Sequence, residues 1–306
     1  MVQQGGASAQ TRLIGPRFKR SASPYVYLFP TMLIMALLMV VPMVMVAQYS
    51  VMDNVITNKH PRFVGLANYL TVFRDAVFLE ATGHTLYFTA MSVIFHMAIG
   101  LLFAMMLNAK SLPKAPKAIL RAIYVMPWMF TATIVAILWR LLLDPSGVVN
   151  HVLRMLGAID GYVEWFGSSA TALNAVTFVN IWAGYPFYMV SLLAGLQGIP
   201  SDLYEAAMID GAGGVRRFWH ITIPQLMPII RSIAMLDFIW TMQVFPLIWM
   251  TTGGGPIHAT EMVSTFTYKL AFSSYKFSLA SASAVVILVF SLAIAFVYVR
   301  YQKARD

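Results

Sequence analysis

Residues 25–52 read YVYLFPTMLIMALLMVVPMVMVAQYSVM, a stretch without a single charged side chain. A helix needs about 20 largely apolar residues to cross the hydrocarbon core of a bilayer, so this stretch is long enough. Basic residues precede it, as they do in a secretory signal, but the apolar part of a signal peptide is only about 7–15 residues long. We therefore expect a retained first spanning helix, preceded by a basic cytoplasmic segment, residues 1–24.

Five further apolar segments of similar length follow, at residues 85–107, 120–143, 172–198, 226–250 and 278–300. Hydrophobic residues make up 59% of the 306-residue chain and charged residues 11%, whereas soluble domains are about 45–50% apolar. Apolar side chains suit a lipid-facing surface, so the composition excludes an ordinary soluble domain. The sequence predicts an all-α integral membrane protein with six transmembrane helices in one domain, residues 25–300, and a cytoplasmic tail, residues 301–306.

The net charge of +9 is spread in short clusters between the apolar segments. This is the pattern of a membrane topology signal rather than of a surface that binds nucleic acid. Six spans put both termini on one side, and the termini and loops of that side carry fourteen of the 21 Lys and Arg residues. Because positive charge concentrates in the cytoplasm, we expect both termini there. In the outer loop 144–168, the apolar spacing predicts a short amphipathic helix.

The cytoplasmic loop after the fourth span, residues 200–224, reads PSDLYEAAMIDGAGGVRRFWHITIP. Ser201 is a suitable N-cap, and two acidic residues lie in the first turn, where the helix dipole favours them. Gly211 can end this helix in a left-handed conformation, and a second short helix would stop before Pro224. The loop therefore predicts a compact helical hairpin. Such a hairpin either contacts another protein or only connects two spans.

Within this loop, three short motifs resemble the EAA loop of ATP-binding-cassette (ABC) importer permeases: Glu205-Ala206-Ala207, Asp210-Gly211-Ala212 and Ile221-x-Ile223-Pro224. The spacing of the family pattern is kept, and Ile223 stands where the family usually has leucine. The segments 192–200 and 252–256 are similar to those of the carbohydrate-uptake branch, which includes maltose and glycerol-3-phosphate permeases. The resemblance covers residues 25–300 and implies the type I ABC importer permease fold.

The resemblance implies a membrane-spanning subunit of a bacterial cytoplasmic (inner) membrane importer for a carbohydrate-type solute: a sugar, an oligosaccharide or a polyol. Its implied partners are a homologous second permease, two ATPase subunits and an external solute-binding protein, besides membrane lipid; nucleic acid is not among them. The implied ATPase-docking residues are Glu205, Ala206, Ala207, Asp210, Gly211, Arg216 and Arg217.

Catalytic signatures are missing from the sequence. No Gly-Lys pair occurs, so there is no phosphate-binding loop of the G-x-x-x-x-G-K-[ST] type. Gly253-Gly254-Gly255 lacks that lysine and more simply predicts a flexible outer loop. We expect no catalytic residue, metal site or cofactor in this chain, and we expect ATP and Mg²⁺ to bind the partner ATPase.

A solute path needs polar or aromatic groups within the spans. In the fourth span, Trp182 and Tyr185 follow helical spacing, and Tyr188 is one turn from Tyr185. Aromatic rings suit sugar rings, because they offer apolar contact with some polar reach. The alternative is that this stripe is ordinary helix packing.

Asp237 is the only carboxylate well inside a predicted span. Charges within a membrane usually face the bundle interior or water, and Trp240 and Thr241 lie one turn further along the helix. We assign these three residues, with the three aromatic residues of the fourth span, to the substrate path. Two alternatives stay open: a structural pair between Asp237 and a basic side chain such as Arg231, or an ion-coupled secondary transporter in which Asp237 carries the coupling ion.

Overall fold

The computed structural model describes residues 27–109 and 113–303. The chain divides into two compact units, residues 1–48 and 49–306. Helices dominate the described part of the chain, and its one isolated β-bridge joins Met52 and Phe63. In chain order the elements are η1 (Ala36–Val40), α2 (Val41–Ser50), α3 (Ala67–Arg74), α4 (Ala76–Asn108), α5 (Lys114–Val125), η2 (Met126–Met129), α6 (Ala132–Leu142), α7 (Val148–Met155), α8 (Ala172–Gln197), α9 (Ser201–Ile209), α10 (Gly214–Arg217), η3 (Phe218–Thr222), α11 (Ile223–Met242), α12 (Pro246–Thr251), α13 (Val263–Tyr268), η4 (Lys269–Ser273) and α14 (Phe277–Lys303).

Among the described residues, five continuous helices are long and apolar enough to cross a membrane: Tyr27–Ser50, Ala76–Asn108, Ala172–Gln197, Gly214–Met242 and Phe277–Phe296. The predicted spans at 172–198 and 278–300 match their helices closely, whereas the second helix begins nine residues before the predicted start at 85. The first of the five helices, at the start of the described chain, is apolar and exposed over residues 27–45. An exposed apolar helix of this kind is suited to contact with lipid.

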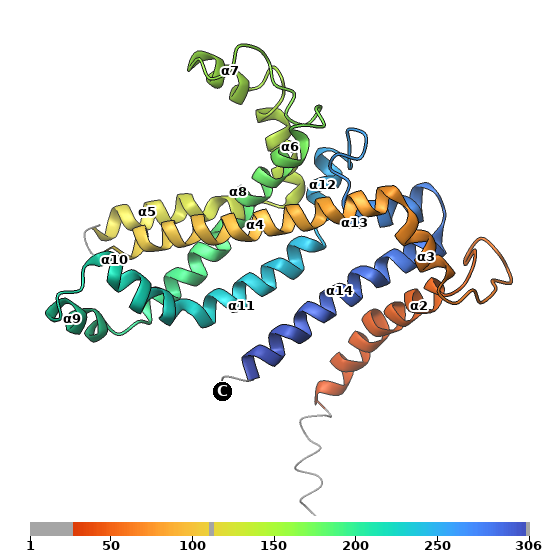
Figure 1. The fold of residues 1–306 in the computed structure, drawn as a ribbon, viewed down its shortest axis with the longest axis horizontal. Coiled ribbons are helices and arrows are strands. Elements are labelled where there is room, and N and C mark those ends of the chain that lie inside the picture. The colour runs from red at the N-terminus through yellow and green to blue at the C-terminus, as the bar shows by residue number, and fades with distance from the viewer. Residues whose placement is uncertain (1–26, 110–112, 304–306) are drawn as a thin grey trace, which may run out of the picture. The chain divides into compact units, whose positions relative to one another are not determined.

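The second and fourth spans, α4 and α8, form the centre of the larger unit (Figure 1). Two glycines let them approach closely. A Cβ on Gly100 would lie 2.4 Å from Cβ of Tyr188, and a Cβ on Gly184 would lie 2.3 Å from Nε2 of His96. Small residues have the same use in other membrane bundles, where close backbone approach increases van der Waals contact. Further toward the C-terminal ends of α4 and α8, Leu107 and Leu192 belong to the main apolar core.

The third span is broken, which the sequence did not predict for residues 120–143. Residues 115–129 and 132–142 are each helical and bend by 99° at the break. Pro127 lies in the three-residue-per-turn helix η2, and Thr131 begins α6 by accepting a hydrogen bond from the N–H of Ile134. Proline lacks the N–H that a continuous helix needs, so the helix ends and a new N-cap restarts it.

The direction of α4 and α8 indicates how often the broken segment crosses. Tyr87 contacts Asn174 near the start of both helices, and Gly100 contacts Tyr188 further along both. The two neighbours therefore run parallel, and the chain must return across the membrane between them. We infer that the bent pair of α5 and α6 is one crossing, which with the five continuous helices gives six.

The fifth span is shifted toward the N-terminus relative to the prediction of 226–250. One helix runs from Gly214 to Met242, so the second short helix does not stop before Pro224 as predicted. A π-helical turn, η3, directly precedes Pro224, and such a wider turn relieves the clash between the proline ring and the preceding carbonyl groups. At the other end, Pro246 disfavours a helical Phe245, and α12 forms separately.

The predicted amphipathic helix in loop 144–168 is confirmed as α7. Asn150 folds this loop: its amide donates to the carbonyl oxygens of Asp144, Pro145 and Val163, and its oxygen accepts from Trp165 Nε1. The hydroxyl of Ser146 donates to Asp144 Oδ1, as does the Ser146 backbone N–H, and these bonds lower the pKa of the Asp144 carboxyl below its usual value.

Candidate functional site

The predicted docking loop is a helical hairpin of α9 and α10. α9 ends in a Schellman motif, in which the N–H of Ala212 donates to the carbonyl of Ala207 at 2.8 Å, and the N–H of Gly211 donates to that of Met208 at 3.0 Å. Gly211 has a φ of +77°, a left-handed conformation that glycine adopts without strain. The prediction that Gly211 ends this helix is confirmed.

The start of α9 differs from the prediction. The cap is Pro200, Ser201 is the first helical residue, and no side chain caps the helix. Proline has a fixed φ and no N–H, so the helix can begin directly after it. The seven residues assigned to ATPase docking all lie on the hairpin or its turn: Glu205, Ala206, Asp210, Gly211 and Arg216 are exposed, and Ala207 and Arg217 are half-buried.

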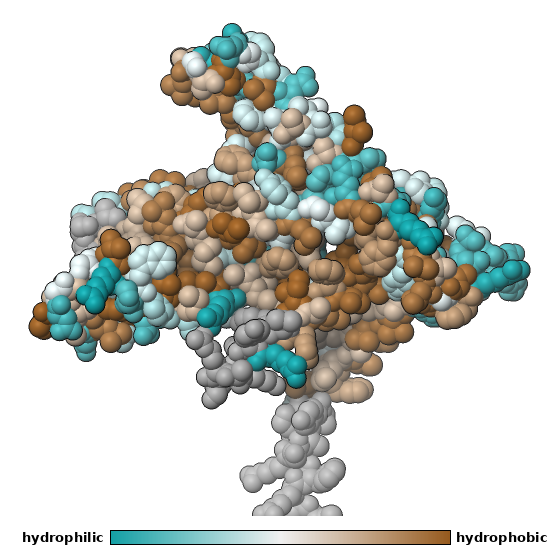
Figure 2. Space-filling view, in the orientation of Figure 1, coloured by the Kyte–Doolittle hydropathy of each residue, from teal (hydrophilic) through white to brown (hydrophobic). Residues whose placement is uncertain are grey.

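Large apolar side chains on this hairpin are also exposed. Ile209 is 88% exposed, Val215 76% and Trp219 60%. They lie among charged residues, and Figure 2 shows brown and teal side chains side by side at this end. A patch of exposed apolar side chains with a polar rim is typical of a protein-interaction site. This patch was not predicted from the small and charged residues of the loop, although its apolar residues flank the glycine turn.

The hairpin is attached firmly to the fifth span. The hydroxyl groups of Tyr204 in α9 and Thr222 in η3 are hydrogen-bonded at 3.0 Å. From Gly214 the chain continues as one helix to Met242. The hairpin and the fifth span are therefore joined both by this hydrogen bond and by a continuous helix.

Inside the bundle, Asp237 of α11 is 8% exposed and has partners from three helices. Tyr188 of α8 donates to Oδ2 at 2.9 Å, and Thr241 donates to Oδ1 at 3.0 Å. His96 Nδ1 of α4 lies 2.8 Å from Oδ2. Buried charges are stable only when they are paired and hydrogen-bonded, and this carboxylate meets both conditions. The partner of Asp237 is thus His96 rather than Arg231.

The histidine ring is bound on both sides. His96 Nε2 lies 3.0 Å from the backbone carbonyl of Asn180, which can only accept a hydrogen bond, so Nε2 carries a proton. On the other side of the ring, Nδ1 faces Asp237 Oδ2 at 2.8 Å, so the imidazole and the carboxyl group form a buried pair. Such a pair avoids most of the cost of an isolated charge in a membrane.

The remaining residues assigned to the substrate path lie elsewhere. Trp182 packs edge-on against Trp139 of α6, with ring centroids 5.4 Å apart, and Tyr185 is buried against Phe103. Trp240 is 57% exposed. Of the six assigned residues, the structure thus joins Tyr188, Asp237 and Thr241 in one hydrogen-bonded cluster and places the other three apart from it.

The exposed ring of Trp240 belongs to an aromatic surface. Its centroid is 5.9 Å from that of Phe187, and Phe187 is 6.0 Å from Trp128 of η2. Trp128 is also more than half exposed. We call Trp128, Phe187 and Trp240 the aromatic surface. Trp128 was not predicted to belong to the site, because it lies just before the break in the third span.

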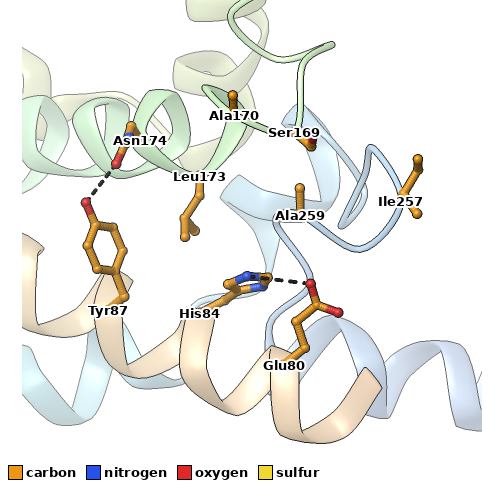
Figure 3. A pocket seen from close by; sticks show the side chains of 9 residues that line it. All are labelled: Glu80, His84, Tyr87, Ser169, Ala170, Leu173, Asn174, Ile257 and Ala259. Carbon is orange, nitrogen blue, oxygen red and sulfur yellow. Dashed lines mark hydrogen bonds and ion pairs between the residues drawn. The ribbon is translucent and has the colours of Figure 1, made fainter. Parts of the chain in front are cut away.

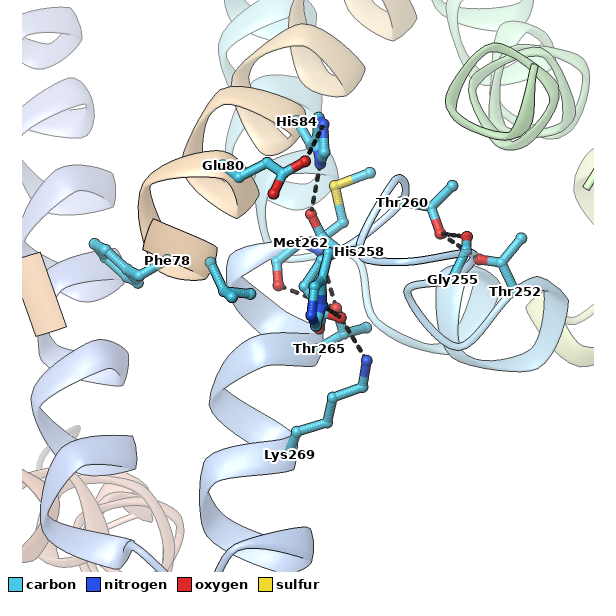
Figure 4. A network of polar contacts seen from close by, with 12 residues as sticks. Phe78, Glu80, His84, Thr252, Gly255, His258, Thr260, Met262, Thr265 and Lys269 are labelled. Carbon is cyan, nitrogen blue, oxygen red and sulfur yellow. Dashed lines mark hydrogen bonds and ion pairs between the residues drawn. The ribbon is translucent and has the colours of Figure 1, made fainter. Parts of the chain in front are cut away.

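At the end of the bundle opposite the hairpin, the glycine loop after α12 is folded around a buried carboxylate (Figure 4). Glu261 is fully buried and forms an ion pair with Lys269, and His258 Nδ1 lies 3.5 Å from its Oε2. Gly254 has a φ of +90°, and a Cβ there would lie 2.3 Å from Glu261 Oε2. The expected flexible loop is instead packed against the bundle, and Gly254 allows the close approach to Glu261.

Next to this loop is a surface hollow of about 580 Å³ between the N-terminal ends of α4 and α8 (Figure 3). His84 and Tyr87 point into it from α4, and Asn174 from α8. Tyr87 donates to Asn174 Oδ1 at 2.7 Å, and His84 Nδ1 lies 3.3 Å from the carbonyl of Glu261. Nowhere in the described part of the chain do three potential metal ligands of the His, Asp or Glu type come together.

Comparison with known proteins defines the class of protein to which this fold and hairpin belong. A family model described as "Binding-protein-dependent transport system inner membrane component" matches residues 5–305. The chain belongs to this family of ABC transporter permeases. The resemblance seen in the docking loop is thereby confirmed, and the chain is a transport subunit rather than an enzyme. The family does not support the alternative of an ion-coupled secondary transporter.

Individual relatives match over nearly their whole length. The trehalose/maltose transport system permease protein MalF of Thermococcus litoralis is 33% identical, and the match covers 94% of this chain and 96% of the length of MalF. The sulfoquinovosyl glycerol transport system permease protein SmoG of Agrobacterium fabrum is also 33% identical, and the match covers 91% of this chain and 90% of the length of SmoG.

A solved structure agrees in fold. In the crystal structure of a bacterial alginate ABC transporter, bound to a periplasmic protein carrying an alginate pentasaccharide, one chain superposes with a TM-score of 0.80. The transporter chain is 25% identical to the present one. The match covers 92% of the present chain and 94% of the transporter chain. The type I ABC importer permease fold is therefore confirmed.

Proposed function

We propose that this chain forms one wall of the translocation path for a carbohydrate-type solute in an ATP-driven importer. The names of its relatives support the solute class: trehalose and maltose for one, a sulfoquinovosyl glycerol for another, and alginate for the solved transporter. The observation that carries the proposal is the hairpin, an ordered structure whose exposed apolar patch has a shape and composition suited to a protein partner.

The hairpin is the proposed contact with the ATPase subunit. Ile209, Val215 and Trp219 supply apolar area that a partner can bury, and Glu205 and Arg216 supply charges around it. Apolar anchors inside a polar rim are the usual arrangement of a protein interface. Because α10 continues into α11, a movement of the ATPase would reach Asp237 through a single helix.

The aromatic surface is the proposed solute contact of this chain. Trp240 and Trp128 expose ring faces, and apolar faces of sugar rings stack on such surfaces. Tyr188 adjoins this surface, because its ring packs edge-on against that of Phe187 with centroids 5.9 Å apart, and its hydroxyl donates to Asp237. Their proposed role is to hold α4, α8 and α11 together beneath the path, while the solute contacts the aromatic rings.

The complete importer would contain a homologous second permease, two ATPase subunits and an external solute-binding protein. ATP and Mg²⁺ would bind the ATPase subunits. The excess of basic residues on the side of the hairpin favours an orientation with the hairpin and both termini in the cytoplasm. The exposed aromatic surface fits this assembly, since one wall of a path must be closed by a second subunit.

Binding of the ATPase subunit to two matched variants tests the proposal. Ile209→Ser removes an exposed isoleucine from the hairpin, and Ile257→Ser removes an equally exposed one, at 90%, from the loop at the opposite end. Full burial of an isoleucine contributes about 1.5–3 kcal/mol, so Ile209→Ser should weaken ATPase binding by roughly ten- to a hundredfold. Ile257→Ser should bind normally. Equal affinity of both variants and the unaltered chain would contradict the proposed contact.

The solute class is tested separately by a binding and uptake screen of the assembled importer. Sugars, oligosaccharides and polyols should stimulate its ATPase activity in the presence of the external binding protein, and amino acids should not. In this assembly, Trp240→Ala should lower uptake, whereas Trp219→Ala on the hairpin should lower ATPase coupling. Stimulation by amino acids alone would exclude the carbohydrate class.

A further inference from the structure

A second hollow, of about 510 Å³, lies at the hairpin end of the bundle between α5 and the ends of α4 and α8. Lys117 and Arg121 line it from α5, Leu193 and Gln197 from α8. We propose that this hollow binds the headgroup of an anionic phospholipid, with the phosphate between Lys117 and Arg121. This inference does not depend on the proposed transport function.

The two basic side chains are available to an anion. Lys117 Nζ donates to the carbonyl of Ala109 at 2.9 Å, just after the end of α4, and this bond holds the ammonium in place. An ammonium has three N–H donors, so two remain. Arg121 is exposed, and its guanidinium has no hydrogen-bond or carboxylate partner among the described residues. Lys117 and Arg121 are four residues apart, which places them one turn apart on one helix face.

The rest of the hollow favours a lipid over a free phosphate ion. Ala118 and Ala122 leave room beside the basic pair, and Leu107 and Leu193 form apolar walls. Val125, one turn after Arg121 on the same face of α5, extends this apolar lining. A headgroup at the basic pair would therefore have apolar surface beside it for its acyl chains. Basic pockets between spanning helices at the cytoplasmic side bind anionic lipid headgroups in this way.

The test counts lipids bound to the assembled, detergent-purified importer by native mass spectrometry, with phosphatidylglycerol and phosphatidylcholine as probes. The double variant Lys117→Gln/Arg121→Gln is compared with Lys59→Gln/Arg62→Gln, which removes the same charge from an exposed loop at the opposite end. Each basic residue near a membrane surface contributes about 1 kcal/mol to anionic lipid binding. The first variant should bind phosphatidylglycerol about ten- to thirtyfold more weakly, and the second should bind it normally.

Further variants separate the hollow from general charge. Arg121→Gln alone avoids the bond that Lys117 makes to α4 and should still weaken binding. Ala122→Phe keeps both charges but fills the hollow, and it should also weaken binding. The proposal is overturned if phosphatidylcholine binds equally well, if inorganic phosphate displaces the lipid, if both double variants bind alike, or if the assembled importer binds no phosphatidylglycerol because a partner subunit occupies the hollow.

Discussion

Asp237 is the residue on which the interior of the bundle depends most. Its carboxylate receives hydrogen bonds from Tyr188 and Thr241 and lies 2.8 Å from His96 Nδ1. Removing one partner of a buried ionic pair typically costs about 3–5 kcal/mol, because the other charge is left uncompensated. The cluster therefore stabilises one arrangement of three helices, and changes to it are expected to act on stability before they act on solute binding.

Tyr188→Phe removes one hydrogen bond to a charged group and leaves the ring in place. We expect the free energy of unfolding to fall by about 1.5–3 kcal/mol. Tyr87→Phe is the matched control, because Tyr87 donates to the uncharged amide oxygen of Asn174 at a more exposed position; its loss should be about 0.5–1.5 kcal/mol. Denaturant unfolding of the purified protein in micelles measures both. An equal or smaller effect at Tyr188 would show that the cluster contributes little.

Gly254 and Gly253 provide a second matched pair. Both have positive φ, but a Cβ at Gly254 would collide with Glu261 Oε2, whereas one at Gly253 would meet its nearest atom at 3.9 Å. Gly253→Ala should therefore cost about 1 kcal/mol for the backbone alone, and Gly254→Ala about 1–3 kcal/mol more. Thermal unfolding of the two variants gives the comparison. Identical midpoints would show that the loop is not packed on Glu261.

Residues also differ in how well the sequence predicts them. Gly211 was predicted correctly because a helix end depends on its immediate neighbours. The partner of Asp237 was not, because His96 is 141 residues away and nothing local in the sequence connects them. A histidine in the middle of an otherwise apolar span is nevertheless a usable signal, since an ionisable group there requires a partner. His96 and Asp237, both well inside predicted spans, could have been paired on that ground.

At the scale of elements, the hairpin is a short rigid unit set by one glycine turn. Gly211→Val places a β-branched residue at φ +77°, which strains the turn, whereas Gly213→Val introduces the same side chain where φ is −66° and no atom lies within 4 Å. We expect Gly211→Val to lose ATPase-coupled uptake and Gly213→Val to keep most of it. Uptake and ATP hydrolysis by the assembled importer are the measurements. If both variants fail equally, crowding of the hairpin and not its turn is responsible.

Hydropathy predicted the existence of the spanning elements better than their shape. It placed all six apolar segments, but an average over about 20 residues does not register a break such as the one after Pro127. The fifth span was placed too late for a related reason: its helix begins in the polar hairpin at Gly214 and ends before Pro246. A proline can be accommodated by a π-helical turn or can end a helix, and tertiary packing decides which.

At the scale of the whole molecule, the parallel pair of α4 and α8 requires the intervening segment to cross the membrane once. The chain has no cysteine, so single-cysteine variants can be labelled without further change. Ala115→Cys precedes the break and Met155→Cys, at a 75% exposed position, follows it. An impermeant maleimide should reach the first only from the cytoplasmic side and the second only from outside. Labelling of both from one side would make the bent pair a re-entrant loop.

The central claim is that this chain transports only as part of an ATP-driven assembly. Uptake of labelled carbohydrate into proteoliposomes tests it most directly, with the chain reconstituted alone and together with a second permease, the ATPase and the external binding protein. We predict ATP-dependent uptake by the complete assembly, loss of that uptake with Ile209→Ser, and none by the chain alone under a proton or sodium gradient. Gradient-driven uptake by the chain alone would contradict the account.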